Sequence, residues 1–392
     1  MLFVGIDVAK SKHDCCIIDS DGVLHNDFLR IENSKLGFDS LVESIYSALD
    51  SKDISNVKIG LESTGHYSTN ITNFLLAKGF QVTTLNPLST NLFRKAHTLR
   101  KTKTDKTDAR VIAAMLFTDD SKSYSPVSYQ ISELKSLTRH RYRMVGYRSK
   151  LKISITRLID IIFPELPSLV WSIHQASSYA VLLELPSPTD ISNCHLTKLT
   201  NLLSKASRGK YGKEKAIAFK SVASNSIGSS SRSICFELQQ TIRLVQSVQS
   251  EIDALDAQIK LVMQEIDSPI MSIPGISFTL GAIILAEIGD IHRFSNPAKL
   301  LAFAGMEPST YQSGKFNASN TPMVKRGSTY LRWAILQAVR LVAMRDVSFK
   351  NYLNHKQSQG KHYYVAISHA GKKLVRLIHS LLKNNCSYIP QH

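Results

Sequence analysis

Residues 2–9, LFVGIDVA, predict a buried strand with a carboxylate at its end. The run is apolar and rich in β-branched side chains, which is typical of strands packed inside a sheet. Asp7 lies near its end, so its carboxylate is tethered to a buried element while the head group reaches the edge. A charge in such a place is costly unless it is paired or bound to a metal ion.

The segments that follow alternate between strand and helix. HDCCIIDSDGVLHNDFLRIE (13–32) predicts a hairpin that turns at SDG, and LGFDSLVESIYSAL (36–49) has apolar residues at helical spacing. VKIGLEST (57–64) and QVTTLN (81–86) predict strands on either side of a helix at 66–80. This order predicts an α/β domain, a mixed sheet with helices packed against it.

Three further carboxylates occupy positions comparable to that of Asp7. Glu62 ends the strand VKIGL, and Asp105 and Asp108 share one face of a helix that begins at KTDKTDAR, 103–110. Asp105 has an alternative role as the cap of that helix. Four convergent carboxylates suit Mg²⁺, or Mn²⁺ in its place, and a pair of such ions suits phosphodiester chemistry. We therefore expect a ribonuclease-H-like metal site at Asp7, Glu62, Asp105 and Asp108.

The composition favours a polyanionic partner. The 392 residues carry 48 Lys and Arg against 31 Asp and Glu, a net charge of +17. No apolar run approaches the roughly 20 residues that a membrane-spanning helix needs. The five cysteines form no CxxC pair, so neither a disulfide framework nor a zinc site is expected, and the interpretation is a reduced, cytoplasmic protein without membrane contact.

A long helix is predicted from Ser132 to Phe163. Its polar faces are almost entirely basic, which predicts nucleic-acid contact, with a solvated face as the alternative. We expect this contact at Arg139, Arg141, Arg143, Arg148 and Lys150.

The rest of the chain divides into three segments. Residues 201–233 are basic and rich in Ser and Gly, and we expect a basic linker or insert region over 166–233. In 234–268, Leu238, Val245, Ile252 and Ile259 repeat every seven residues, which predicts a coiled coil, or alternatively an amphipathic helix on the core of the same chain. Residues 269–392 predict a mostly helical domain.

A polar loop interrupts this C-terminal domain between Pro308 and Gly327. Lys315, Lys325 and Arg326 are expected to hold phosphate there. The serines in and beside the loop are Ser309, Ser313, Ser319 and Ser328. Serine is a weak nucleophile that needs a nearby base or metal, and the residues alone do not say which serine has that help.

GIDVAK, LESTGHY and KTDKTDAR, in this order and spacing, resemble the RuvC-like DEDD domain of a bacterial insertion-sequence transposase family that includes the Piv invertases. IPGISFTLGAIILAEIGDIHRF, AFAGMEPSTYQSGK and KRGSTYLRWAILQA resemble its C-terminal transposase domain. The resemblance covers nearly the whole chain. It implies a RuvC-like DEDD domain over 1–165 and a transposase domain over 269–392. Between them lie the insert at 166–233 and the coiled coil at 234–268.

The resemblance also implies an activity. Members of the family are bridge-RNA-guided serine recombinases, so we expect a metal-dependent DNA recombinase with a covalent serine–DNA intermediate. Ser313, in TYQSGK, matches the family's serine, although one glycine follows it where the family commonly has two. Ser328 is the fallback, and a helix cap is its simpler role.

The expected partners are donor and target DNA, a structured guide RNA, and further copies of the chain, from a dimer to a tetramer. One alternative is a RuvC-like metal-dependent nuclease or junction resolvase without a covalent step. A second is a nucleic-acid-binding protein that is not an enzyme.

Overall fold

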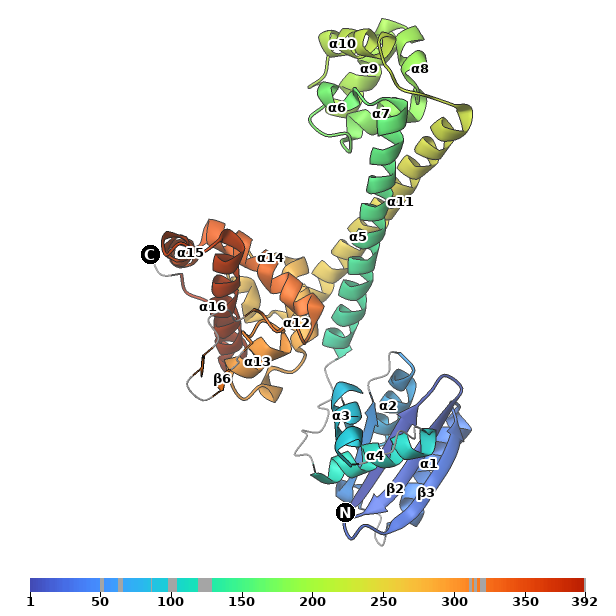
Figure 1. Cartoon of the computed structure of the whole chain (residues 1–392), viewed down its shortest axis with the longest axis vertical. Coiled ribbons are helices and arrows are strands. Elements are labelled where there is room, and N and C mark those ends of the chain that lie inside the picture. The colour runs from blue at the N-terminus through green and yellow to red at the C-terminus, as the bar shows by residue number, and fades with distance from the viewer. Residues whose placement is uncertain are drawn as a thin grey trace. The chain divides into compact units, whose positions relative to one another are not determined.

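The computed structural model (Figure 1) describes residues 1–49, 53–62, 66–85, 87–97, 104–118, 129–309, 312–313, 316–317 and 322–390. It divides into two compact units, residues 1–127 and 128–392. The first unit is shorter than the expected domain at 1–165, because the helix that begins at Tyr129 belongs to the second unit.

The first unit is built on a five-stranded mixed sheet with the order β3-β2-β1-β4-β5. The expected hairpin is formed by β2 (Lys12–Asp19) and β3 (Leu24–Glu32), and β2 runs antiparallel to β1 (Leu2–Val8). On the other side of β1, β4 (Val57–Glu62) and β5 (Gln81–Leu85) are parallel to it and to each other. The α/β prediction is therefore confirmed, strand by strand.

Helices cover both faces of this sheet. On one face, α1 (Lys35–Ser47) and α2 (Ser68–Ala77) pack on the alternate apolar residues of the strands, such as Ile6, Ile17 and Ile59. The short 3-10 helix η1 (Ile54–Asn56) precedes β4. On the other face, α4 (Asp105–Thr118) packs on β1 and β2, and α3 (Pro87–His97) contacts α4.

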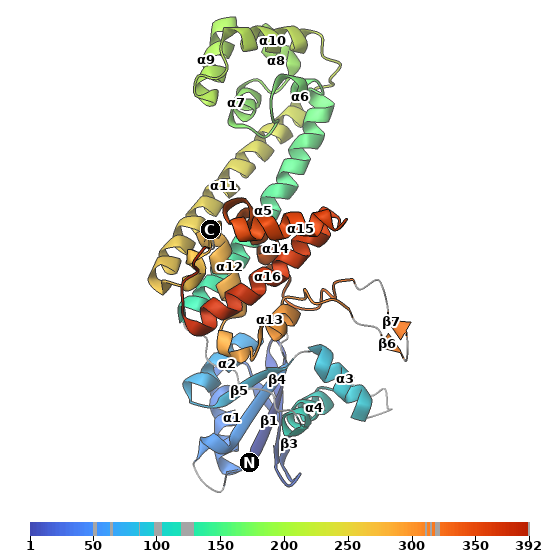
Figure 2. The same cartoon turned by 90° about the vertical axis from the view of Figure 1, so that its left-hand side faces the viewer.

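Two long helices form the frame of the second unit. α5 (Tyr129–Ile162) and α11 (Arg232–Ile266) pack along each other, as Figures 1 and 2 both show. Five shorter helices between them enclose an apolar core of their own with the adjoining ends of the two long helices. These five are α6 (Leu166–Leu169), α7 (Ala176–Glu184), α8 (Pro188–Asn193), α9 (Leu196–Ser207) and α10 (Lys213–Ser224).

The C-terminal helices gather at the other end of α5 and α11. Their shared core includes Leu134 of α5 and Ile259 of α11. The elements are η2 (Pro269–Ser272), α12 (Phe278–Ile288), η3 (Ile291–Arg293), α13 (Pro297–Phe303), β6 (Gln312–Ser313), β7 (Phe316–Asn317), α14 (Thr329–Arg345), α15 (Val347–Ser358) and α16 (Tyr363–Asn384). The expectation of a mostly helical C-terminal region is confirmed.

The heptad stripe of α11 is used inside the chain. Leu238, Val245, Ile252 and Ile259 are all buried, the first two in the core of the short helices and the last in that of the C-terminal helices. This agrees with the alternative of an amphipathic helix on the chain's own core. None of the described helices combines the length and the apolar character that crossing a membrane requires.

Candidate active site

Three strands present carboxylates on the sheet face that α4 covers. Asp7 follows Gly5 by two residues in β1, so both side-chain positions are on one face, because side chains alternate along a strand. Gly5 meets the backbone of α4, which identifies that face. Glu62 ends β4, parallel to β1, and Asp14 of β2 pairs directly with Asp7. Three carboxylates therefore lie at one edge of the sheet.

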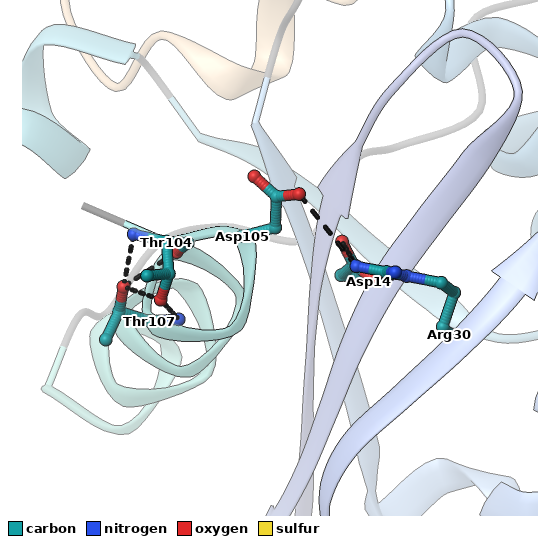
Figure 3. A network of polar contacts seen from close by, with 5 residues as sticks. All are labelled: Asp14, Arg30, Thr104, Asp105 and Thr107. Carbon is teal, nitrogen blue, oxygen red and sulfur yellow. Dashed lines mark hydrogen bonds and ion pairs between the residues drawn. The ribbon is translucent and has the colours of Figure 1, made fainter.

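The first turn of α4 brings two more carboxylates, and Asp105 is not its cap. Thr104 and Thr107 cap the helix reciprocally (Figure 3). The Thr107 amide donates to Thr104 Oγ1 at 3.3 Å, and the Thr104 amide donates to Thr107 Oγ1 at 2.9 Å. Asp105 is the first residue of the helix, and its side chain is 62% exposed. The carboxylate of Asp105 is thus available for another role.

Burial and neighbouring carboxylates both disfavour the charged form of Asp7. Partial burial raises the pKa of Asp7 from 3.8 to about 6, and the negative charges of Asp108, Asp105 and Glu62 act in the same direction, in that order. The carboxylates of Glu62, Asp105 and Asp108 are therefore near enough to Asp7 to disfavour its charged form.

Arg30 of β3 joins this site from the side. Its guanidinium donates to both carboxylate oxygens of Asp14, at 2.7 and 3.3 Å, and lies 4.0 Å from the carboxylate of Asp105 (Figure 3). Asp14 is only 5% exposed, so the arginine compensates a buried charge. Arg30 therefore holds the Asp14 carboxylate in place beside Asp105.

A second arginine and a polar pocket lie beside Asp108. Arg94 of α3 donates to Asp108 at 3.1 Å and to Asn91 at 3.0 Å. A pocket of about 230 Å³ opens here, between the end of β4 and the helices α3 and α4. Glu62, Asn91, Arg94 and Asp108 line it.

The carboxylate oxygens of this site suit a hard divalent cation, although the described side chains are not arranged around one ion position. Carboxylate oxygens are the ligands that Mg²⁺ prefers, and burial together with the neighbouring carboxylates raises the pKa of Asp7. Within the described residues, no three His, Cys, Asp or Glu side chains are arranged to ligate one ion. A bound cation would have to draw the four carboxylates together.

The loop that carries Ser313 projects from the C-terminal helices. Its base is closed by backbone hydrogen bonds, from Ser309 to Pro322 (2.8 Å) and from Val324 to Glu307 (3.0 Å). At its far end (Figure 2), Ser313 pairs with Phe316 in the antiparallel hairpin of β6 and β7. Lys315 and Ser319 lie outside the described residues. Lys325 and Arg326 are exposed at the base of the loop.

Ser328 has the structural role that the sequence favours. Its hydroxyl oxygen accepts from the amide of Leu331 at 3.1 Å and so caps α14. The same hydroxyl donates to the buried Glu287 at 2.7 Å. Burial raises the pKa of Glu287, but the hydrogen bonds from Arg139 and Ser328 outweigh it and hold this pKa below its usual value.

The basic side chains of α5 fall into two groups. Arg139 and Arg141 make paired hydrogen bonds to Glu287 and Asp256, and Arg148 donates to Gln249, so these three hold α5 to α12 and α11. Arg143 and Lys150 are exposed, and in the described part of the chain neither forms an ion pair. Of the five residues expected to bind nucleic acid on this helix, these two face solvent.

Sequence reasoning missed Asp14, Arg30 and Arg94. A signal for Asp14 was present, because it precedes the apolar run at 15–18 and, two residues before Cys16, shares a face with it. Arg30 and Arg94 gave no signal, since arginines are common in this basic chain. Only the pairing of the strands and the packing of α3 bring them to the carboxylates.

Comparison with known families gives a consistent result for both ends of the chain. The DEDD model of IS110, described as a transposase, matches residues 4–164. The model described as "Transposase IS116/IS110/IS902 family" matches residues 267–354, so the two matches together span more than half of the chain. This chain belongs to the IS116/IS110/IS902 family of transposases.

Individual relatives agree with this family assignment. An uncharacterized protein of insertion element IS116 from Streptomyces clavuligerus is 24% identical, with 99% of this chain and 96% of that protein covered. A putative transposase of the IS117 mini-circle from Streptomyces coelicolor is 25% identical, over 80% and 78% of the two chains. The pilin gene-inverting protein of Moraxella lacunata is 27% identical over 36% of this chain and 41% of its own.

A transposase is an enzyme that cleaves and rejoins DNA, and this chain is one. Its family therefore argues against the alternative of a binding protein without catalysis. The carboxylate site and the serine loop are the two places in the chain where such chemistry was expected from the sequence.

Proposed function

We propose that the first unit is a ribonuclease-H-like, RuvC-like domain whose four carboxylates, Asp7, Glu62, Asp105 and Asp108, form the metal site of a DNA recombinase. The observation that carries this proposal is the arrangement of the elements. Asp7 and Glu62 lie at the ends of neighbouring parallel strands, and Asp105 and Asp108 lie in the first turn of the helix that packs on that face of the sheet. The mixed sheet, with Asp7 on its central strand and Glu62 on the parallel neighbour, supports it.

Mg²⁺, or Mn²⁺ in its place, would polarise a phosphodiester and stabilise the charge that develops on the leaving oxygen. The chain's residues contribute the rest. Asp7 and Glu62 are held by strands, and Asp105 and Asp108 by a capped helix. Arg94 and Arg30, at either side, keep the carboxylates of Asp108 and Asp14 in place.

We propose Ser313 as the nucleophile of the covalent step. As its Oγ–phosphorus bond forms, the hydroxyl loses its proton, the phosphorus–oxygen bond of the strand breaks and the leaving oxygen takes up a proton. A hydroxyl of another strand end reverses the step and rejoins DNA. Ser313 lies in the hairpin of β6 and β7 rather than at a helix terminus, which supports this choice over Ser328, the hydroxyl of which caps α14.

The alternative within this enzyme class is a metal-dependent nuclease or junction resolvase without a serine intermediate. One observation favours it: all four carboxylates lie in the compact unit of residues 1–127, so every residue of the proposed metal site belongs to that unit. The second unit would then serve for binding alone.

The partners follow from the same proposal. A strand exchange involves four strands, so we propose a dimer or tetramer acting on donor and target DNA. A structured RNA as the guide remains a prediction from the family resemblance, supported by the net charge of +17. A cytoplasmic location likewise remains a prediction.

Substitution of each acid in turn tests the metal site. Asp7→Asn, Glu62→Gln, Asp105→Asn and Asp108→Asn should each abolish strand cleavage and rejoining, while DNA affinity stays close to that of the original protein. Asp21→Asn, which changes an exposed carboxylate in the β2–β3 turn, is the control. Full activity in the Asp7, Glu62 or Asp108 variant would contradict the assignment.

A further inference from the structure

A cavity of about 600 Å³ lies beneath the base of the serine loop, between the helices α14 and α16. This volume is in the range of pockets that hold small-molecule ligands. One wall is formed by residues at the two ends of the loop, such as Pro308 and Lys325. The cavity and the loop therefore share structural elements.

The lining of this cavity has one sign of charge. Lys325, Arg332, Lys361 and Lys372 line it together with His369, and no carboxylate does among the described residues. Lys361, His369 and Lys372 recur along one face of α16 and its N-terminal approach, as residues three and four apart do on a helix. In the part of the chain that the structure describes, none of the three lysines of the lining takes part in an ion pair.

Burial and neighbouring positive charges disfavour the protonated forms of His369 and Lys372. Burial lowers the pKa of His369, and the charges of Lys372, Lys361 and Lys356 lower it further. Burial and Arg376 lower the pKa of Lys372 in the same way. An anion in the cavity would relieve this repulsion, as a metal ion would at the carboxylates of the first unit.

The remaining wall of the cavity is apolar and aromatic. Leu336 and the ring of Tyr364 line it, and Tyr364 is 62% exposed. The guanidinium of Arg340 lies 5.7 Å from the Tyr364 ring, and its buried Nε has no hydrogen-bond partner among the described residues. The Tyr364 ring also contacts the rings of His362 and Tyr363. An exposed ring beside cations is suited to stack on a base while the cations hold the adjoining phosphates.

We propose that this cavity binds one unpaired nucleotide of a nucleic-acid strand. Lys361 and Lys372 hold its phosphates, and Tyr364 stacks on its base. The proposal depends on the proposed function only in taking nucleic acid as the ligand. A strand held there would run past the base of the loop that carries Ser313.

The test compares two pairs of substitutions in the full-length protein. Lys361→Gln with Lys372→Gln removes two charges from the cavity. Lys299→Gln with Lys350→Gln removes two exposed charges of the same unit that do not line it. The probe is a labelled single-stranded oligonucleotide of arbitrary sequence, and its dissociation constant is measured across salt concentrations.

Each phosphate that a lysine no longer neutralises should reduce the slope of log affinity against log salt by about 0.7 for a single strand. The cavity pair should therefore lower the slope by about 1.4, twice that value, and the control pair should leave it nearly unchanged. Equal slopes for both pairs would overturn the proposal. Inorganic phosphate and a free mononucleotide, used as competitors, distinguish a phosphate site from a nucleotide site.

Tyr364 separates stacking from a general basic surface. Tyr364→Ala should weaken single-strand binding roughly tenfold and leave duplex binding unchanged, whereas Tyr364→Phe should retain both. Equal weakening of duplex and single strand would contradict the stacking role. Both tests measure binding alone. A negative result here would therefore not bear on the serine intermediate, and failure to trap that intermediate would not bear on this site.

Discussion

Asp7 is the central residue of the carboxylate site in the first unit. Its strand buries it, its register places it beside Asp14 and Glu62, and the first turn of α4 adds Asp105 and Asp108. Folding thus brings negative charges close enough together to repel one another. The cost of that confinement is what a bound cation would offset.

This confinement predicts a pH-dependent gain in stability for Asp7→Asn. Because the pKa of Asp7 rises from 3.8 to about 6 on folding, protonation of Asp7 stabilises the fold below pH 4, and this contribution is lost as the pH rises through 6. The variant should gain melting temperature over the original protein at pH 8, and not at pH 4. Thermal unfolding without divalent ions at both pH values is the measurement.

The same measurement with Mg²⁺ on the order of 1000-fold above its dissociation constant should raise the melting temperature of the original protein, and much less that of Asp7→Asn. Asp21→Asn should behave as the original protein. No difference between the pH 8 and pH 4 results would argue against a crowded carboxylate site.

Substitution of Ser328 should affect stability rather than catalysis, because its hydroxyl caps the N-terminus of α14. Ser328→Ala removes the cap of α14 and one hydrogen bond to Glu287, and should lower the free energy of unfolding by about 1 kcal/mol. Urea unfolding measures this loss. Recombination below the unfolding range should persist, and its complete loss in a folded variant would favour Ser328 as the nucleophile.

At the scale of elements, the contact of α4 with the sheet positions half of the carboxylate site. A Cβ on Gly5 would lie 2.1 Å from the carbonyl oxygen of Ala109 and 2.4 Å from the amide nitrogen of Ala113. Only glycine therefore lets α4 approach β1 this closely. The distance of Asp105 and Asp108 from Asp7 depends on that approach.

Gly5→Ala should therefore displace α4, lower the free energy of unfolding by about 1–3 kcal/mol and abolish catalysis. Gly146→Ala is the matched control, because a Cβ there meets nothing within 4 Å, and alanine in a helix is about 1 kcal/mol more favourable than glycine. Denaturant unfolding and a strand-exchange assay measure the two effects. An active, fully stable Gly5→Ala protein would contradict this account of the site.

A test of nucleic-acid binding by α5 should change only those basic residues of the helix that form no ion pair within the described chain. Reversing Arg139 would leave the buried Glu287 unpaired and cost about 3–5 kcal/mol, which confounds a binding measurement. Arg143→Glu with Lys150→Glu leaves those pairs intact and should flatten the salt dependence of DNA affinity by about 1–2 in log–log slope. An unchanged slope would show that this face of α5 does not contact DNA.

These examples show what the sequence could and could not predict. Period-two and helical patterns placed the five strands of the sheet and the four acids, because those patterns arise from local geometry. The pairing of Arg139 and Arg141 with acids more than 100 residues away could not be predicted, since a basic stripe looks the same whether it faces solvent or another helix. The core of the short helices was missed because its apolar residues lie in a basic, Ser-rich background.

At the scale of the whole molecule, the proposed mechanism draws on both units. The first holds the carboxylates, and the second holds the serine loop, the paired long helices and the basic cavity. Family membership assigns DNA cleavage and rejoining to the chain. We propose that a covalent link between Ser313 and DNA keeps the energy of the cleaved phosphodiester bond for rejoining. A nuclease that only hydrolyses DNA would not form such a link.

The measurement that tests this claim most directly is the trapping of that link. The protein is incubated with target DNA, any required RNA and Mg²⁺, then denatured, and the products are separated and mapped by peptide mass. The account predicts a denaturation-resistant adduct on the peptide that contains Ser313, absent in Ser313→Ala, a variant that still binds DNA. Strand exchange without any adduct would contradict the mechanism, and an adduct at Ser309 or Ser328 would contradict the choice of residue.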